Sequence, residues 1–222
     1  METSHNLEPK DLLDQTIPFD IKKVYLLDDI TRAMYSNDPA VITQANQILS
    51  EFQQDGTSWQ YADIILENSK ENNTKFIALN ILSDTVQNKW KVLPEGQKSG
   101  IKEFLSKMII TLWKQEEENN SQHLLTKLNE TLVFILKHEL TTTWRDFISE
   151  ICEASKTHQG IWENTLEILK LLSEEIFDFS KDVISSKRVD ELKDNMTNDF
   201  TKIYELWVFV LNTYIENAGT VK

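Results

Sequence analysis

The stretch from residue 72 to residue 91 reads NNTKFIALNILSDTVQNKWK, and it decides the fold class. Large apolar residues recur in it at steps of three and four, and polar residues recur at the same steps. Residues at these spacings share one side of an α-helix, so each set forms its own face. The two sets are Leu79, Leu82, Val86 and Trp90 on the apolar side, and Asn80, Asp84, Gln87 and Lys91 on the polar side. The stretch is therefore predicted to be an amphipathic helix whose apolar face needs a neighbouring helix.

Similar stripes lie on both sides of this stretch, separated by short breakers. Upstream, Asp38 and Pro39 are typical of a helix start, because the carboxylate caps the first turn and the proline fits the first helical position. Thr57 and Gln60 have the spacing of a capping box for the next helix. Downstream, the acidic and amide-rich run over residues 116–120 is predicted to be a loop.

Pairing the eight stripes between residues 25 and 180 gives four helix-turn-helix units with a repeat of about 40 residues. This spacing predicts an all-α fold, an α-α superhelix or HEAT-repeat solenoid of about four and a half repeats. A right-angled globular bundle remains the alternative. Residues 1–24 have no sustained period, and their structure stays open. Residues 181–222 are predicted to form one long first helix of a fifth repeat, cut before its partner, with an apolar face half uncovered.

The composition bears on the fold class and on the kind of partner. Five glycines and four prolines in 222 residues are too few for the turns of an all-β chain. The formal net charge of −13 disfavours nucleic acid and anionic membranes as direct partners, because most of the surface would repel them. A basic protein surface fits better, although the charge also serves solubility. No run approaches the roughly 20 apolar residues that span a bilayer, and no secretory leader is recognisable, so an intracellular protein is expected.

The sequence offers no catalytic constellation, so the chain is not expected to be an enzyme and no cofactor is implied. It has no glycine-rich phosphate loop and no nucleophile elbow. The single cysteine, Cys152, excludes an internal disulfide and is expected to be buried and inert. The histidines are too widely spaced for a metal site; they are His5, His123, His138 and His158.

Several stretches resemble a known family. Residues 45–66, ANQILSEFQQDGTSWQYADIIL, resemble the opening of importin-β family transport receptors. Residues 168–180, ILKLLSEEIFDFS, resemble one branch of that family, the exportins that carry leucine-rich nuclear export signals. The resemblance runs from about Leu26 to Asn217, and only the first two dozen residues depart from it.

This resemblance implies a stack of HEAT repeats whose second helices line a concave surface. In the family that surface grips the small GTPase Ran in its GTP form, and the complex shuttles between nucleus and cytoplasm through pores lined with nucleoporin Phe-Gly repeats. The groove for cargo with a leucine-rich export signal, and the family's reactive cysteine, lie in later repeats, so Cys152 is not equated with that cysteine. A HEAT scaffold without GTPase dependence and an import receptor of the same superfamily remain the alternatives.

Candidate Ran-binding residues are the polar positions on the second helix of each predicted pair. Such a stripe is first of all a solvated helix face, and it becomes a binding hypothesis only through the resemblance. The candidates are Gln44, Gln47, Lys75, Asn80, Asp84, Gln87, Lys91, Lys127, Glu130, Lys137, Lys170 and Glu174.

Overall fold

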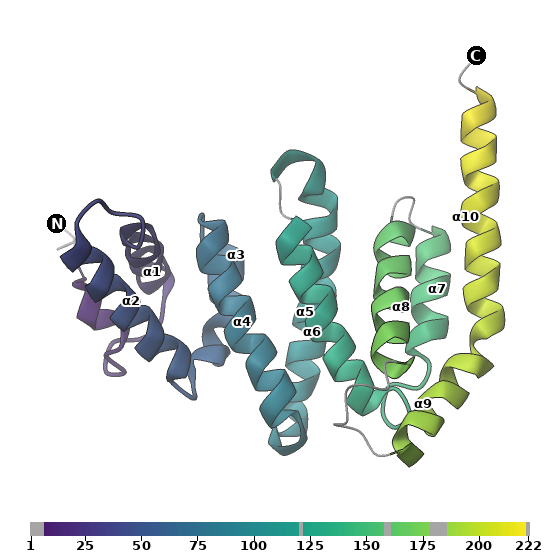
Figure 1. The fold of residues 1–222 in the computed structure, drawn as a ribbon, viewed down its shortest axis with the longest axis horizontal. Coiled ribbons are helices and arrows are strands. Elements are labelled where there is room, and N and C mark those ends of the chain that lie inside the picture. Colours follow the sequence, from purple (N-terminus) through teal and green to yellow (C-terminus); the bar gives the residue numbers. More distant parts are fainter. Residues whose placement is uncertain (1–6, 120–121, 158–160, 178–185, 221–222) are drawn as a thin grey trace. The chain divides into compact units, whose positions relative to one another are not determined.

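The computed structural model describes residues 7–119, 122–157, 161–177 and 186–220, and every regular element in them is a helix (Figure 1). Three short 3₁₀ helices, η1–η3, accompany ten α-helices in these ranges. The elements are η1 (Pro9–Leu12), α1 (Ile21–Ala33), α2 (Pro39–Gln54), η2 (Ser58–Tyr61), α3 (Ala62–Asn68), α4 (Asn72–Lys89), η3 (Trp90–Val92), α5 (Glu95–Asn119), α6 (Gln122–Glu139), α7 (Phe147–Thr157), α8 (Ile161–Phe177), α9 (Ser186–Asn198) and α10 (Phe200–Thr220).

The fold is the expected all-α, HEAT-like array, in which consecutive helices pack as pairs. α1 packs on α2, α3 on α4, and α7 on α8. The chain divides into two compact units. One comprises Met1–Phe104 and Asn119–Lys127, and the other comprises Leu105–Glu118 and Leu128–Lys222.

The first unit is built around the predicted helix of residues 72–91. All four of its apolar positions are buried, with Leu79 and Val86 fully enclosed. α3 and α1 cover this face. The regular helix ends at Lys89, and Trp90 begins η3. The start of α2 is also as predicted, because the Asp38 carboxylate accepts the Ala40 backbone N–H and Pro39 is the first helical residue.

The structure settles part of the open amino-terminal segment. α1 begins at Ile21, a few residues before the first regular stripe, and Asp20 caps it. The Nζ of Lys23 donates to the carbonyl of Asp14 at 2.7 Å and to that of Leu12 at 3.4 Å, so a buried lysine ties the segment to α1. Phe19 stacks on Tyr61 with ring centroids 4.2 Å apart. The segment is thus anchored by one charged and one aromatic contact.

Two local predictions were wrong. Thr57 makes no capping hydrogen bond, because its hydroxyl donates to the Asp55 carboxylate and η2 forms instead of a regular first turn. Residues 116–119 of the acidic run are helical, since α5 continues through Asn119, and residue 120 lies outside the described residues. Charged residues with good helix propensity extend a helix as readily as they form a loop when no glycine or proline intervenes.

In the second unit, buried amide side chains join α6 to α8. The amide nitrogen of Asn129 donates to Asn164 Oδ1 at 2.7 Å, and the Asn164 amide returns a bond at 3.3 Å. Both residues are buried. Between α7 and α8, the hydroxyls of Ser155 and Thr165 lie 2.6 Å apart. Each of these four buried polar side chains has a partner, as a stable core requires.

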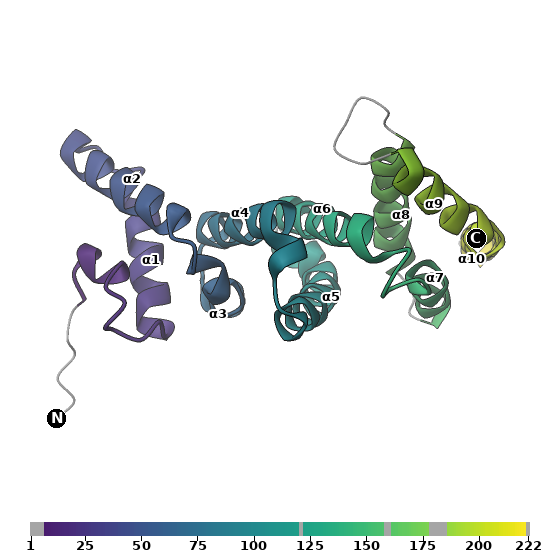
Figure 2. The ribbon, with the colours of Figure 1, turned by 90° about the horizontal axis from the view of Figure 1, so that it is seen from below.

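The predicted single long helix after residue 181 is two helices. α9 ends at Asn198, a turn falls at Asp199, and α10 begins at Phe200. α9 packs on α8 while α10 packs on α7 (Figure 2). Arg188 holds the start of α9 to the end of α6, donating to the His138 carbonyl at 2.8 Å and also bonding the Thr141 hydroxyl. Assignment of this segment to a fifth repeat remains a prediction.

Candidate partner-binding surface

The polar stripe of α4 keeps three side chains on one face. Asp84 and Gln87 are exposed and Asn80 is half-buried. Their buried neighbours hold the opposite face against α3 and α1, so the stripe is directed away from the core. The Gln87 amide reaches only its own helix, donating to the Ser83 hydroxyl at 3.3 Å. The stripe therefore presents a carboxylate and two amides, groups suited to hydrogen bonding with a protein partner.

The two remaining candidates near α4 lie outside this three-residue stripe. Lys91 falls in η3, just beyond the end of the helix, and is exposed. Lys75 precedes Asn80 by five residues on a continuous helix, which puts it about 140° around the axis from the stripe. Lys75 therefore does not share the face of the other α4 candidates.

The candidates of α2 belong to the same unit as α4. Gln44 and Gln47 are both exposed, on a helix that buries Ile48 and Phe52. Gln47 donates to Glu51 at 2.9 Å within the helix. Such an exposed bond is easily exchanged for one to a partner.

Several candidate residues on α6 and α8 already contact other side chains. Lys127 and Glu130 are half-buried and have contacts of their own. The Nζ of Lys137 lies 2.6 Å from Glu175 Oε2, with side chains only 13% and 14% exposed. On α8, Lys170 pairs with Glu167 at 3.3 Å, and Glu174 is exposed. Lys137 thus acts first as a link between helices, whereas Lys170 and Glu174 remain accessible.

Aromatic residues on these polar faces were missed by sequence reasoning. Phe76 lies four residues before Asn80 and is 37% exposed, with its ring 5.8 Å from that of His123 at the start of α6. Phe177 lies three residues after Glu174 and is 45% exposed. The sequence did contain a sign of their exposure. Both phenylalanines are spaced three or four residues from a polar candidate, which puts them on the solvated face of the helix rather than in the core. Exposed aromatic side chains often anchor protein partners.

Three other features were sought in the described part of the chain: a metal site, a membrane-spanning helix and a reactive cysteine. No group of three or more histidine, cysteine or acidic residues lies where it could hold a metal ion within these residues. Among the described helices, none is both long and apolar enough to span a membrane. Cys152 is fully buried, and burial raises the pKa of its thiol to about 11, as expected for an inert side chain.

Comparisons with known proteins place the chain among nuclear transport receptors. A family model described as importin-beta N-terminal domain matches residues 45–111, and one described as exportin 1-like protein matches residues 121–222. Exportin-1 of Drosophila melanogaster is 39% identical over 209 residues, which is 93% of this chain and 19% of the relative. The chain belongs to the exportin family.

Two relatives from another organism differ in their similarity to the chain. Exportin-1 of Dictyostelium discoideum is 38% identical over 212 residues, covering 94% of this chain and 19% of the relative. The importin-13 homolog A of the same organism is only 24% identical over 200 residues, covering 85% of this chain and 18% of the relative. The chain spans about a fifth of the length of the exportins that it matches.

Proposed function

We propose that this chain is the Ran-GTP-binding, amino-terminal region of a nuclear export receptor for proteins with leucine-rich export signals. The observation that carries the proposal is its 39% identity to an exportin-1 over 93% of the chain. The polar stripe of α4 supports it, because Asp84 and Gln87 are exposed to a partner. The net charge of −13 suits a partner with a basic surface.

In this proposal the chain works as a binding module rather than an enzyme. The receptor shuttles between nucleus and cytoplasm, and nucleoporin Phe-Gly repeats are its contacts during passage. Cargo is held by a groove in repeats later than those of this chain. The stripe of α4, the exposed glutamines of α2 and the accessible pair Lys170 and Glu174 on α8 contribute to the Ran contact.

The first test is nucleotide dependence. The purified 222-residue protein is titrated by calorimetry with Ran loaded with a non-hydrolysable GTP analogue, and separately with Ran loaded with GDP. Preference for the GTP form is expected. Equal affinity for both forms would favour a scaffold that ignores the nucleotide, and no binding to either form would contradict the proposal.

The second test is location. Replacing Asn80, Gln87 and Lys91 together by alanine should weaken binding about tenfold or more, since central polar contacts of an interface carry such losses. The matched control replaces Lys89, which is exposed and lies at the end of the same helix on another side. Equal losses in the two variants, or none in the first, would remove the stripe from the interface.

A further inference from the structure

A small cavity of the first unit lies between the segment that precedes α1 and the helices behind that segment. Its walls come from residues 12–19, from Lys23 on α1, from the end of α2 and from η2. Its volume is about 20 Å³. On the same scale one water molecule needs roughly 10–15 Å³, so the cavity has room for one water and little more.

The hydroxyl of Ser58 on η2 lines this cavity. The residue is only 1% exposed, so bulk water does not reach the hydroxyl. In the part of the chain that the structure describes, the hydroxyl has no hydrogen-bond partner. A buried hydroxyl without a partner destabilises a fold, and such groups are rare in native proteins. Ser58 therefore needs a partner inside the cavity.

The ammonium of Lys23 has the complementary need. Its side chain is 2% exposed, and Nζ donates to the carbonyls of Asp14 and Leu12. The Phe19 ring lies 5.9 Å from Nζ and favours the charge, but it offers no lone pair. An ammonium carries three N–H donors, so the two carbonyl bonds leave one donor for a further acceptor. No atom of the described residues takes this third bond.

The charges around the cavity favour water over an ion. A metal cation would lie against the Lys23 ammonium and be repelled. An anion would meet Asp14 and Asp55, which also line the cavity, and a phosphate is too large for the space. Water suits these walls because it accepts a bond from an ammonium and donates to a hydroxyl or a carboxylate oxygen.

We propose that this cavity is a binding site for one internal water molecule, which accepts from the Lys23 ammonium and donates to the Ser58 hydroxyl. The water links α1 to η2 beneath the segment that precedes α1. It adds to the two direct contacts of that segment, the carbonyl bonds of Lys23 and the stacking of Phe19 on Tyr61. The segment is thereby an integral part of the first unit, whether or not the unit binds Ran.

The first experiment is a high-resolution crystal structure of the 222-residue protein. One ordered water is expected in the cavity, within hydrogen-bonding distance of both Lys23 Nζ and Ser58 Oγ. A dry cavity, a metal ion or an anion at this position would overturn the proposal. A Ser58 hydroxyl that bonds a protein acceptor instead would overturn it as well.

The second experiment uses Ser58→Ala, whose effect differs in sign between a hydrated and a dry site. If water satisfies the hydroxyl, alanine removes a hydrogen bond, and the protected amides of residues 12–19 should exchange about three- to tenfold faster. If the site is dry, alanine removes an unpaired buried hydroxyl, and exchange should be unchanged or slower, which would contradict the proposal. Ser50→Ala, at an exposed position of α2, is the control and should stay within about twofold of the wild type.

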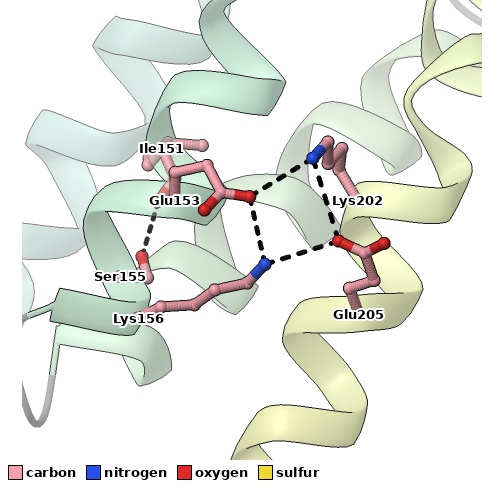
Figure 3. Close-up of polar contacts among 6 residues, drawn as sticks. All are labelled: Ile151, Glu153, Ser155, Lys156, Lys202 and Glu205. Atoms are coloured by element: carbon pink, nitrogen blue, oxygen red, sulfur yellow. Dashed lines mark hydrogen bonds and ion pairs between the residues drawn. The ribbon is translucent and has the colours of Figure 1, made fainter.

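The third experiment tests the bridge itself. Lys23→Met removes the ammonium, so adding Ser58→Ala should then change exchange less than it does in the wild type, because residues that share one water are coupled. Lys202→Met is the matched control, since it removes a half-exposed ammonium that lies between Glu153 and Glu205 in the other unit (Figure 3). In that background Ser58→Ala should keep its full effect. Equal effects in all three backgrounds would refute the bridge, and if Lys23→Met does not fold, the sign of the Ser58→Ala effect still decides.

Discussion

Lys137 and Glu175 form the tightest ion pair between helices in the described part of the chain, with Nζ and Oε2 2.6 Å apart. The pair joins α6 to α8, and little of either side chain reaches solvent. The ammonium also lies 5.7 Å from the centroid of the Phe134 ring. Lys137 was a candidate for partner binding on sequence grounds, and its environment indicates that it stabilises the fold.

Lys137→Ala is expected to lower the free energy of unfolding by about 2 kcal/mol, because the Glu175 carboxylate would lose the neighbouring ammonium in a poorly solvated position. Urea denaturation measures this. Lys170→Ala is the control, since its pair with Glu167 is 59% and 42% exposed and contributes less than about 1 kcal/mol. Equal losses in the two variants would contradict a structural role specific to Lys137.

Asp28→Ala is expected to be strongly destabilising. The buried Asp28 carboxylate accepts the Ser69 hydroxyl at 2.5 Å and the Lys70 backbone N–H at 3.1 Å, so it fastens α1 to the turn between α3 and α4. Loss of the acceptor removes both of these bonds, one of them to a buried hydroxyl, at a cost of about 2–3 kcal/mol. The neighbouring Asp29 is exposed, and Asp29→Ala should change stability by less than about 0.5 kcal/mol. Thermal and urea unfolding of both variants provide the comparison.

Asp199→Asn is expected to raise stability near neutral pH. Burial raises the pKa of the Asp199 carboxyl above 3.8, the Asp146 carboxylate raises it further, and Lys202 partly offsets both. A raised pKa means that the folded state binds the proton more tightly, so stability falls as the pH rises from about 3.8 through the raised pKa. Asparagine removes this cost, and it is also a favoured residue just before a helix start.

The melting temperature of Asp199→Asn should therefore exceed that of the wild type at pH 7, and the gain should shrink as the pH falls towards 4. Asp194→Asn, at an exposed position of α9, is the control and should show no such gain. A gain for Asp199→Asn that grows on acidification would refute the assignment.

Cys152 is expected to be almost unreactive in the folded protein. With a pKa of about 11, roughly one thiol in a thousand is ionised at pH 8, and the side chain is also enclosed. Ellman's reagent should label the folded protein at least about a hundredfold more slowly than the protein in denaturing urea. Fast stoichiometric labelling under native conditions would show that α7 opens far more often than its packing indicates.

The sequence predicted most of the helices because their signals are local. The cap and proline at the start of α2 and the two faces of α4 depend on residues within a few positions of each other. The break at Asp199 was hidden because the apolar period continues from Met196 to Phe200 and Ile203 across the turn. What interrupts the helix is the change of neighbour, from α8 to α7, and a tertiary contact of this kind has no local pattern.

The binding candidates were predicted less completely for a similar reason. Spacing alone identified the polar faces, but it could not reveal that Lys137 has a partner 38 residues away. The burial of Lys23 was equally invisible, because its acceptors are backbone carbonyls and lysine is usually exposed. Phe76 was missed because an aromatic residue is taken as core until its face is known.

The reciprocal amide bonds of Asn129 and Asn164 have an evolutionary consequence. A mutation at either position alone would strand the remaining amide between α6 and α8, and the chain would lose stability before it could gain a new function. Amino-acid replacements at these two positions should therefore occur together. Among descendants of this sequence, both asparagines should persist or both should be replaced together by apolar residues, with single replacements selected against.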